Sequence, residues 1–88
     1  MESNKLSEMI NIGKELEKML IGVGINTPQD LVEIGSVEAT KRLKLKGVAC
    51  YNKLYALEGA IRDMRWHGLS KLDKENLKEA YNKETVEN

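Results

Sequence analysis

The sequence contains very little cysteine and proline, and it has no net charge. Its 88 residues include one Cys and one Pro, and 14 basic side chains balance 14 acidic ones. A single cysteine cannot form an internal disulfide, which fits a reducing compartment. With so little proline and with abundant Leu, Glu and Lys, the composition favours helices over sheet. The zero net charge excludes the strongly basic composition that by itself indicates a nucleic-acid or anionic-membrane partner.

Long apolar runs are also missing. No stretch approaches the length that spans a bilayer, and the polar N-terminus, Met-Glu-Ser-Asn-Lys, lacks the apolar core of a signal peptide. We therefore expect a cytoplasmic protein without a membrane partner. The length allows one modest core, so residues 1–88 are predicted to form a single domain with frayed tails at 1–5 and 83–88.

The residues needed for metal binding or catalysis are too few. The one cysteine, Cys50, and the one histidine, His67, are not accompanied by a cluster of acids, so no metal site is predicted. Nothing in the sequence positions a nucleophile beside His67. Glu58 stands on an apolar helix, and Arg62, one turn later, is its expected ionic partner. We predict no enzyme activity, no metal and no cofactor.

The charge that is present is unevenly distributed. Residues 1–38 have a net charge of −4, residues 39–65 of +5 and residues 66–88 of −1. The middle segment contains one dense basic run, made of Lys41, Arg42, Lys44 and Lys46. This run has two interpretations, a solvated helix face or a source of non-specific attraction for nucleic acid.

Apolar residues recur at helical spacing through the first half of the chain. In the segment 13–23, which Gly24 is predicted to end as a left-handed cap, they are Leu16, Met19, Leu20 and Val23. Thr27, Pro28 and Asp30 then predict a second helix start. The threonine caps the helix, proline suits its first position, and the aspartate completes a capping box.

Glycines predict the boundaries of the next two helices. Gly35 is predicted to end the second helix, and Ser36 to be the N-cap of a third helix that runs to Gly47. The longest helix is expected at 50–66, because its apolar positions form a broad face, and His67-Gly68 is expected to end it.

The last predicted helix begins with a capping box, Ser70-x-x-Asp73. Its expected inward residues are Leu72, Leu77 and Tyr81. No segment alternates with period two while being rich in β-branched residues, so no strand is predicted. The fold class is all-α, a compact domain of five or six helices.

Two similar turns, each reading apolar–polar–apolar–Gly, precede predicted helices. They are Ile10-Asn11-Ile12-Gly13 and Val32-Glu33-Ile34-Gly35. A helix start after such a turn presents free backbone N–H groups to a phosphate, and Lys14 would add a positive charge. The other interpretation is that Gly13 and Gly35 only allow close helix packing. Glu33 would repel a phosphate, so the second turn is interpreted as architectural.

Three segments together resemble a known family. They read Ile12-Gly13-x-x-Leu16-x-x-x-Leu20-x-x-x-Gly24-Ile25, Leu54-Tyr55-Ala56-Leu57-Glu58-Gly59-Ala60 and Arg65-Trp66-His67-Gly68-Leu69. Over residues 6–80 the chain resembles the C-terminal domain of the TfoX (Sxy) family, known from bacterial regulators of natural competence. Because such regulators carry a further N-terminal domain, for which this chain is too short, we expect a stand-alone copy of the domain.

The resemblance also implies a helical domain related to helix-hairpin-helix modules, which hold nucleic-acid backbone through the N–H groups of a hydrophobic-x-Gly-hydrophobic-Gly turn. The corresponding turn here runs from Met9 to Gly13, with Asn11 in place of the first glycine. Asparagine tolerates the left-handed backbone angles of glycine. The implied site is Asn11, Ile12, Gly13 and Lys14, with attraction supplied by Lys41, Arg42, Lys44 and Lys46.

Two functions remain open. The first is a non-enzymatic nucleic-acid-binding or regulatory module that contacts DNA backbone through the turn before Lys14. The second is a protein–protein interaction domain, in which the basic third helix meets an acidic partner and the glycine turns are purely structural. The first function is favoured if Gly13, Lys14 and the basic run at 41–46 form one continuous positive patch. Trp66 and the three tyrosines have core spacing, so we assign them to packing and not to base stacking.

Overall fold

Helices account for all the regular structure in the part of the chain that the structure, a computed structural model, describes, namely residues 5–86. The elements are, in chain order, the 3-10 helix η1 (Leu6–Glu8), α1 (Lys14–Ile21), α2 (Pro28–Ile34), α3 (Ser36–Leu45), α4 (Tyr51–Arg62), the 3-10 helix η2 (Trp66–Gly68) and α5 (Lys71–Val86). The predicted all-α class with five helices is confirmed. Within the described range, no helix is long and apolar enough to cross a membrane.

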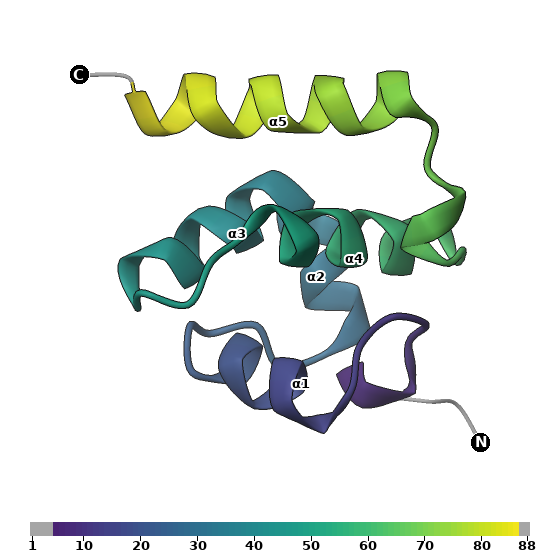
Figure 1. The fold of residues 1–88 in the computed structure, drawn as a ribbon. Coiled ribbons are helices and arrows are strands. Elements are labelled where there is room, and N and C mark those ends of the chain that lie inside the picture. The colour runs from purple at the N-terminus through teal and green to yellow at the C-terminus, as the bar shows by residue number, and fades with distance from the viewer. Residues whose placement is uncertain (1–4, 87–88) are drawn as a thin grey trace.

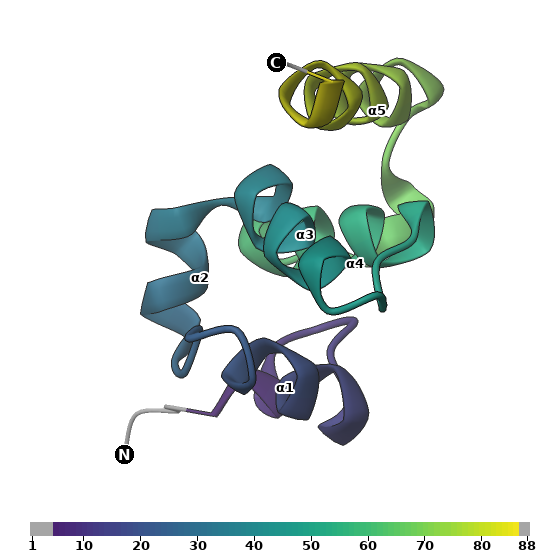
Figure 2. The ribbon, with the colours of Figure 1, turned by 90° about the vertical axis from the view of Figure 1, so that its left-hand side faces the viewer.

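The helices are arranged in three levels (Figures 1 and 2). Helix α1 and η1 lie at the bottom, α3 and α4 pack side by side in the middle, and α5 lies across the top. Helix α2 stands upright at one side and leads the chain from the bottom level into α3. Turning the molecule by 90° shows α2 to the left of the α3–α4 pair, α5 above it and α1 below it (Figure 2).

Helix α1 ends at Ile21, two residues before the predicted Val23, and α2 begins at Pro28 as the sequence predicts. The predicted left-handed Gly24 closes the turn that follows α1. Gly24 has φ +89°, and the N–H of Ile25 bonds back to the carbonyl of Leu20 at 2.9 Å, which satisfies a terminal carbonyl. At the start of α2, the backbone N–H of Asp30 donates to the Thr27 hydroxyl at 3.1 Å. The Asp30 carboxylate accepts from the N–H of Asn26, also at 3.1 Å, so the box closes one residue earlier than expected.

The junction of α2 and α3 differs from the prediction. Gly35, with φ +89°, is both the end of α2 and the N-cap of α3, so Ser36 is the first helical residue and not the cap. The Ser36 side chain is buried, and its hydroxyl donates to the Glu58 carboxylate at 2.6 Å. The Ser36 hydroxyl, which the sequence assigns to capping, therefore bonds to Glu58 on α4 instead.

Helix α4 is shorter than expected. It stops at Arg62 because Asp63 takes a left-handed conformation with φ +61°, and the N–H of Met64 bonds to the carbonyl of Gly59 at 2.8 Å. The predicted continuation to residue 66 is wrong, and Trp66 begins the separate helix η2. Gly68, predicted as the end of α4, belongs to η2.

Helix α5 is the longest element, with 16 residues. Its predicted capping box is confirmed, because the N–H of Asp73 donates to the Ser70 hydroxyl at 3.0 Å. Leu72, predicted to face inward, is 65% exposed, whereas Tyr81 is buried. The helix continues to Val86, past residue 83, where the sequence predicts the start of a frayed tail. Residues 1–4 and 87–88, in the predicted tails, lie outside the described part.

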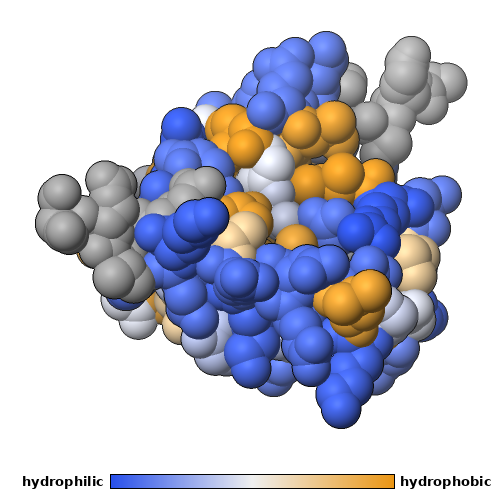
Figure 3. Space-filling model, turned by 90° about the horizontal axis from the view of Figure 1, so that it is seen from above, coloured by the Kyte–Doolittle hydropathy of each residue, from blue (hydrophilic) through white to orange (hydrophobic). Residues whose placement is uncertain are grey.

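The core consists of two clusters. The first joins η1, α1, α2, α3 and α4, and its buried members are Leu6, Ile12, Leu20, Ile25, Leu31, Ala39, Leu43, Leu57 and Ala60. The second lies beneath α5, and its buried members are Leu54, Tyr55, Leu69 and Tyr81. Seen from above, the molecule has a mainly hydrophilic surface with hydrophobic side chains gathered in a strip between hydrophilic rims (Figure 3).

Candidate nucleic-acid interface

The turn before α1 has one residue with a left-handed backbone angle. Asn11 has φ +73°, a left-handed angle, at the position that the resemblance assigns to the first glycine of the hairpin turn. Ile12 is buried and donates its N–H to the carbonyl of Met9 at 3.2 Å. Gly13 is exposed and serves as the N-cap of α1. Asparagine at this position thus keeps the shape of a glycine turn.

The Asn11 side chain is used inside the protein. Its Nδ2 donates to the carbonyl of Met64 at 2.8 Å and to that of Ala56 at 3.3 Å. Its Oδ1 accepts from the backbone N–H of Trp66 at 3.3 Å. Three backbone groups near the end of α4 are satisfied by one amide, so any contact of Asn11 with a phosphate would have to come from its backbone.

Close approach of backbones occurs at Gly59 and not at the glycines that the sequence singles out. A Cβ added to Gly59 would lie 2.5 Å from Asn11 Nδ2 and 2.6 Å from the Met64 carbonyl oxygen. A Cβ added to Gly13 or Gly35 would meet nothing within 4 Å, so the interpretation that these two allow close packing is wrong. The signal for Gly59 was available, because a glycine inside an otherwise strong helical pattern indicates a packing constraint.

The start of α1 carries free backbone donors and one nearby cation. The first helical bond runs from the Glu17 N–H to the Gly13 carbonyl at 3.0 Å, so the three N–H groups before it have no helical acceptor. Gly13 has no side chain to cap them. Lys14 and Glu15 are both exposed, whereas the Glu17 carboxylate turns back and accepts from the N–H of Ser7 at 3.2 Å. The site therefore has mixed charge, with outward N–H groups.

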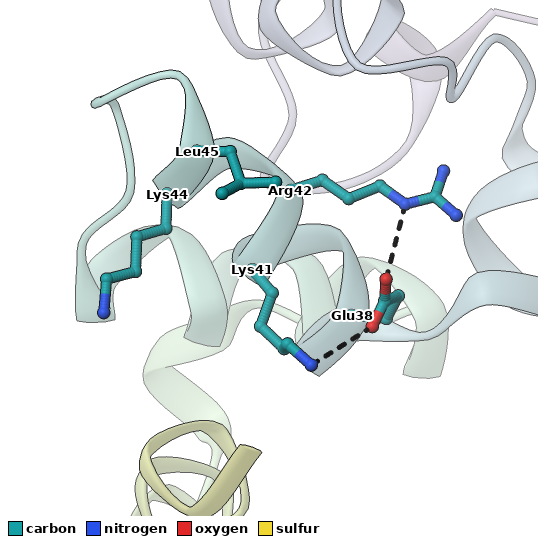
Figure 4. Close-up of a pocket in the computed structure, with 5 residues that line it drawn as sticks. All are labelled: Glu38, Lys41, Arg42, Lys44 and Leu45. Atoms are coloured by element: carbon teal, nitrogen blue, oxygen red, sulfur yellow. Dashed lines mark ion pairs between the residues drawn. The ribbon is translucent and has the colours of Figure 1, made fainter. Parts of the chain in front are cut away.

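The predicted basic run divides between two sides of α3 (Figure 4). Arg42 extends toward the turn after α1, where its Nη1 lies 3.5 Å from the Val23 carbonyl oxygen. Lys44 lies on another side, with its Nζ 5.9 Å from the centre of the Tyr81 ring. Glu38 pairs with both Lys41, at 3.6 Å, and Arg42, at 3.5 Å. Lys46 follows the helix and is exposed.

The structure does not join this basic run to the turn before α1. Arg42 reaches the residues that follow the C-terminal end of α1, whereas Lys14 is its first residue. Eight helical residues separate those ends by about 12 Å. Arg42 therefore meets α1 at the end opposite Lys14, which counts against a continuous patch of Gly13, Lys14 and residues 41–46 and against the DNA-binding hypothesis that the patch would favour. The turn instead contacts the Arg65–Trp66–His67 segment, through Asn11.

Glu58 and the residues around it form an ionic network with a structural role. The predicted Glu58–Arg62 pair is confirmed at 2.7 Å, and Arg62 also pairs with Asp73 at 3.2 Å. The hydrogen bond with Glu58 raises the pKa of Arg62. The Glu58 carboxylate joins α3 to α4, because it binds both the Ser36 hydroxyl and Arg62. Arg62 in turn joins α4 to α5 through Asp73. Among the described residues, no three His, Cys, Asp or Glu side chains gather as a metal-binding set.

Comparison with known proteins gives one family and two similar solved structures. The model of the TfoX C-terminal domain matches residues 2–81. An uncharacterized protein from Listeria monocytogenes, in a triclinic crystal form, is 45% identical with a TM-score of 0.83, covering 94% of each chain. A protein of unknown function from Listeria monocytogenes, in a tetragonal form, is 46% identical with a TM-score of 0.80, covering 93% of this chain and 99% of that one. None of the curated proteins matches.

Proposed function

Since this chain belongs to the TfoX C-terminal domain family, we propose that it is a small, non-enzymatic nucleic-acid-binding or regulatory module of the cytoplasm. The proposed contact is the turn from Asn11 to Lys14, which would hold DNA backbone through its N–H groups. The contact is with phosphates, so it carries no sequence information.

The observation that best supports this mode of DNA binding is the left-handed backbone angle of Asn11. It gives the turn the shape of a glycine turn and leaves Gly13 exposed with open space around its Cα. A phosphate could approach the free N–H groups at the start of α1 without a steric obstacle at Gly13. The helix dipole and the Lys14 ammonium would both favour its negative charge.

The charge distribution determines how strongly the turn is expected to bind DNA. The basic run of α3 lies away from the turn, so it can add only long-range attraction, and Glu15 opposes a phosphate beside Lys14. We therefore expect weak binding with a shallow dependence on salt, because the slope scales with the number of phosphate contacts and only a few are available.

The test is a gel-shift titration of a short DNA duplex at low salt with the wild-type protein and two charge-reversal variants. Lys14→Glu should weaken binding by about threefold to tenfold, since one phosphate contact is lost and a repulsion is added. Lys83→Glu makes the same change of charge on exposed α5 and should leave binding nearly unchanged. Absence of binding at tens of micromolar protein, or equal effects of the two variants, would reject the proposed contact.

A second candidate function, a protein–protein interaction domain, is favoured by a different feature. Leu45, at the end of α3, is 87% exposed, and it lines a shallow groove together with Glu38, Lys41, Arg42 and Lys44, which leaves the groove with an excess of positive charge (Figure 4). Such a surface suits an acidic partner segment that presents an apolar side chain. Capture of a partner that survives nuclease treatment, and that is lost in Leu45→Ser but retained in Val32→Ser, would favour this function. Val32 is the control because it is also exposed, at 52%, but lies on α2.

A further inference from the structure

Five aromatic rings contact one another in series across α4, η2 and α5. From one end to the other they are His67, Trp66, Tyr55, Tyr51 and Tyr81. The tightest contact is between Trp66 and His67, whose ring centres are 4.2 Å apart with an interplanar angle of 28°. Trp66 in turn stacks on Tyr55 at 6.0 Å and 25°. The sequence assigns Trp66 and the three tyrosines to core packing, which holds for the buried Tyr55 and Tyr81 but not for Tyr51, which is 40% exposed. His67 is exposed as well.

The two ends of this series differ. Tyr81 is buried and meets Tyr51 edge-on, whereas His67 is exposed. The inner rings are accompanied by lysines of α5, with Lys74 Nζ 5.1 Å from the centre of the Trp66 ring and Lys78 Nζ 5.0 Å from that of Tyr51. His67 stacks on Trp66 through one face, and the residue as a whole is exposed to solvent. A further flat ring placed on its other face would continue the stack.

The segment that carries His67 is held in place before any ligand arrives. The N–H of Trp66 donates to Asn11 Oδ1, and the N–H of Gly68 bonds to the Arg65 carbonyl at 2.8 Å. Leu69, the next residue, is buried in the second core cluster. A ring that is already fixed loses little conformational freedom on binding, which favours affinity.

Two cations lie close to the exposed ring in sequence. Arg65 and Lys71 are exposed, and neither forms an ion pair with a carboxylate of the described residues. Asp63 is the opposing charge on the same segment and is also exposed. The segment from Asp63 to Lys71 thus combines an exposed flat ring with an excess of positive charge, a combination that suits single-stranded nucleic acid.

We propose that the outer face of His67 is a stacking site for a nucleobase of single-stranded DNA or RNA, with Arg65 and Lys71 attracting the adjoining phosphates. A duplex hides the faces of its bases in its own stack, so this site selects single strands. The inference rests on the proposed nucleic-acid function for its ligand class, but it uses a base and a different surface. Asn11 joins the two surfaces, since its backbone shapes the phosphate turn and its side chain bonds to Trp66.

The first measurement uses the lone tryptophan as a reporter. Titration of the full chain with a short oligothymidylate at low salt should quench Trp66 fluorescence, because the base stacks on the ring that lies against it. The blunt duplex of the same length should quench it little. Binding of the oligothymidylate without quenching would overturn the His67 site.

The second measurement compares variants by the fluorescence anisotropy of labelled oligonucleotides, which does not depend on Trp66. His67→Ala should weaken single-strand binding about tenfold, in the range found for loss of one stacked base, and leave duplex binding unchanged. His67→Tyr restores a flat ring and should recover most of the affinity. Circular dichroism of both variants controls for folding.

The outcomes separate the two proposals. Equal single-strand affinity of wild type and His67→Ala overturns the His67 site, while duplex binding that falls in Lys14→Glu still supports the phosphate turn. Single-strand binding that depends on His67, with no duplex binding, supports the stacking site and rejects the turn. Absence of binding to either probe overturns both.

Discussion

At the scale of single residues, Asn11 and Gly59 determine how the turn before α1 packs against the end of α4. The side chain of Asn11 reaches three backbone groups that lie 45 to 55 residues further along the chain. Gly59 leaves the space that this side chain and the Met64 carbonyl occupy. A polar side chain with three buried or half-buried partners is costly to remove, because its partners then lose their hydrogen bonds.

Gly59→Ala should therefore destabilise the domain even though alanine is the better helix former. The new methyl group would overlap Asn11 Nδ2 and the Met64 carbonyl, and overpacking of this kind costs about 1–3 kcal/mol. Urea denaturation of both proteins measures the difference. Gly13→Ala is the matched control, since its Cβ meets nothing within 4 Å, and it should change stability by less than about 1 kcal/mol. Equal stability of wild type and Gly59→Ala would contradict the steric argument.

Two substitutions of Asn11 separate its backbone role from its side-chain role. Asn11→Gly keeps the left-handed angle but loses the three hydrogen bonds, and it should cost about 1–3 kcal/mol of unfolding free energy. Asn11→Ala loses the same bonds and must also hold φ +73°, which should add about 1 kcal/mol. Denaturation midpoints in urea give both values. An alanine variant as stable as the glycine variant would show that the turn relaxes to another conformation.

At the scale of the elements, most helix ends follow local rules. The cap at the start of α5 also makes the stability of the fold depend on pH. Loss of hydration alone would raise the pKa of Asp73. The hydrogen bonds with the backbone and side chain of Ser70, together with the charge of Arg62, outweigh this effect and hold the pKa below its ordinary value of 3.8. The ionised carboxylate therefore binds its partners better in the folded chain than in the unfolded one.

A carboxylate with a lowered pKa stabilises the fold fully above its unfolded pKa, and this contribution disappears as the pH falls through the folded pKa. Wild type should thus be more stable than Asp73→Asn at neutral pH. This difference in stability should disappear between about pH 5 and pH 2. Thermal denaturation over this pH range measures it. Asp63→Asn, which removes an exposed carboxylate without an ion pair to the described residues, should show no comparable narrowing. A constant gap for Asp73→Asn would rule out the linkage.

At the scale of the whole molecule, the two charge-bearing regions of interest lie on different parts of the surface. The turn before α1 adjoins the Arg65–Trp66–His67 segment, whereas the basic residues of α3 lie near the end of α1 and beside α5. A nucleic acid and an acidic protein segment could therefore bind to separate surfaces of one domain. Such an arrangement is compatible with a small regulatory module that joins two partners.

Much of the fold could be predicted from the sequence because its signals are local. Thr27 and Ser70 cap helices through hydrogen bonds that span three residues, and Glu58 pairs with Arg62 across one helical turn. Gly24 closes the turn after α1 through the conformational freedom of its own backbone. Each of these interactions closes within one turn of chain, so residue type and spacing are sufficient to identify it.

By itself, then, the sequence determined the helical class, these caps, and the left-handed turn at Asn11. Only the tertiary structure decided where α4 ends, which glycine allows close packing, and which residues adjoin the turn. Those outcomes depend on contacts such as Asn11 with Trp66, between residues 55 positions apart. No local pattern specifies such a pair, because the energy that selects it arises only when the core brings both segments together. The same contact joins the segment that carries His67 to the turn at which a phosphate is proposed to bind.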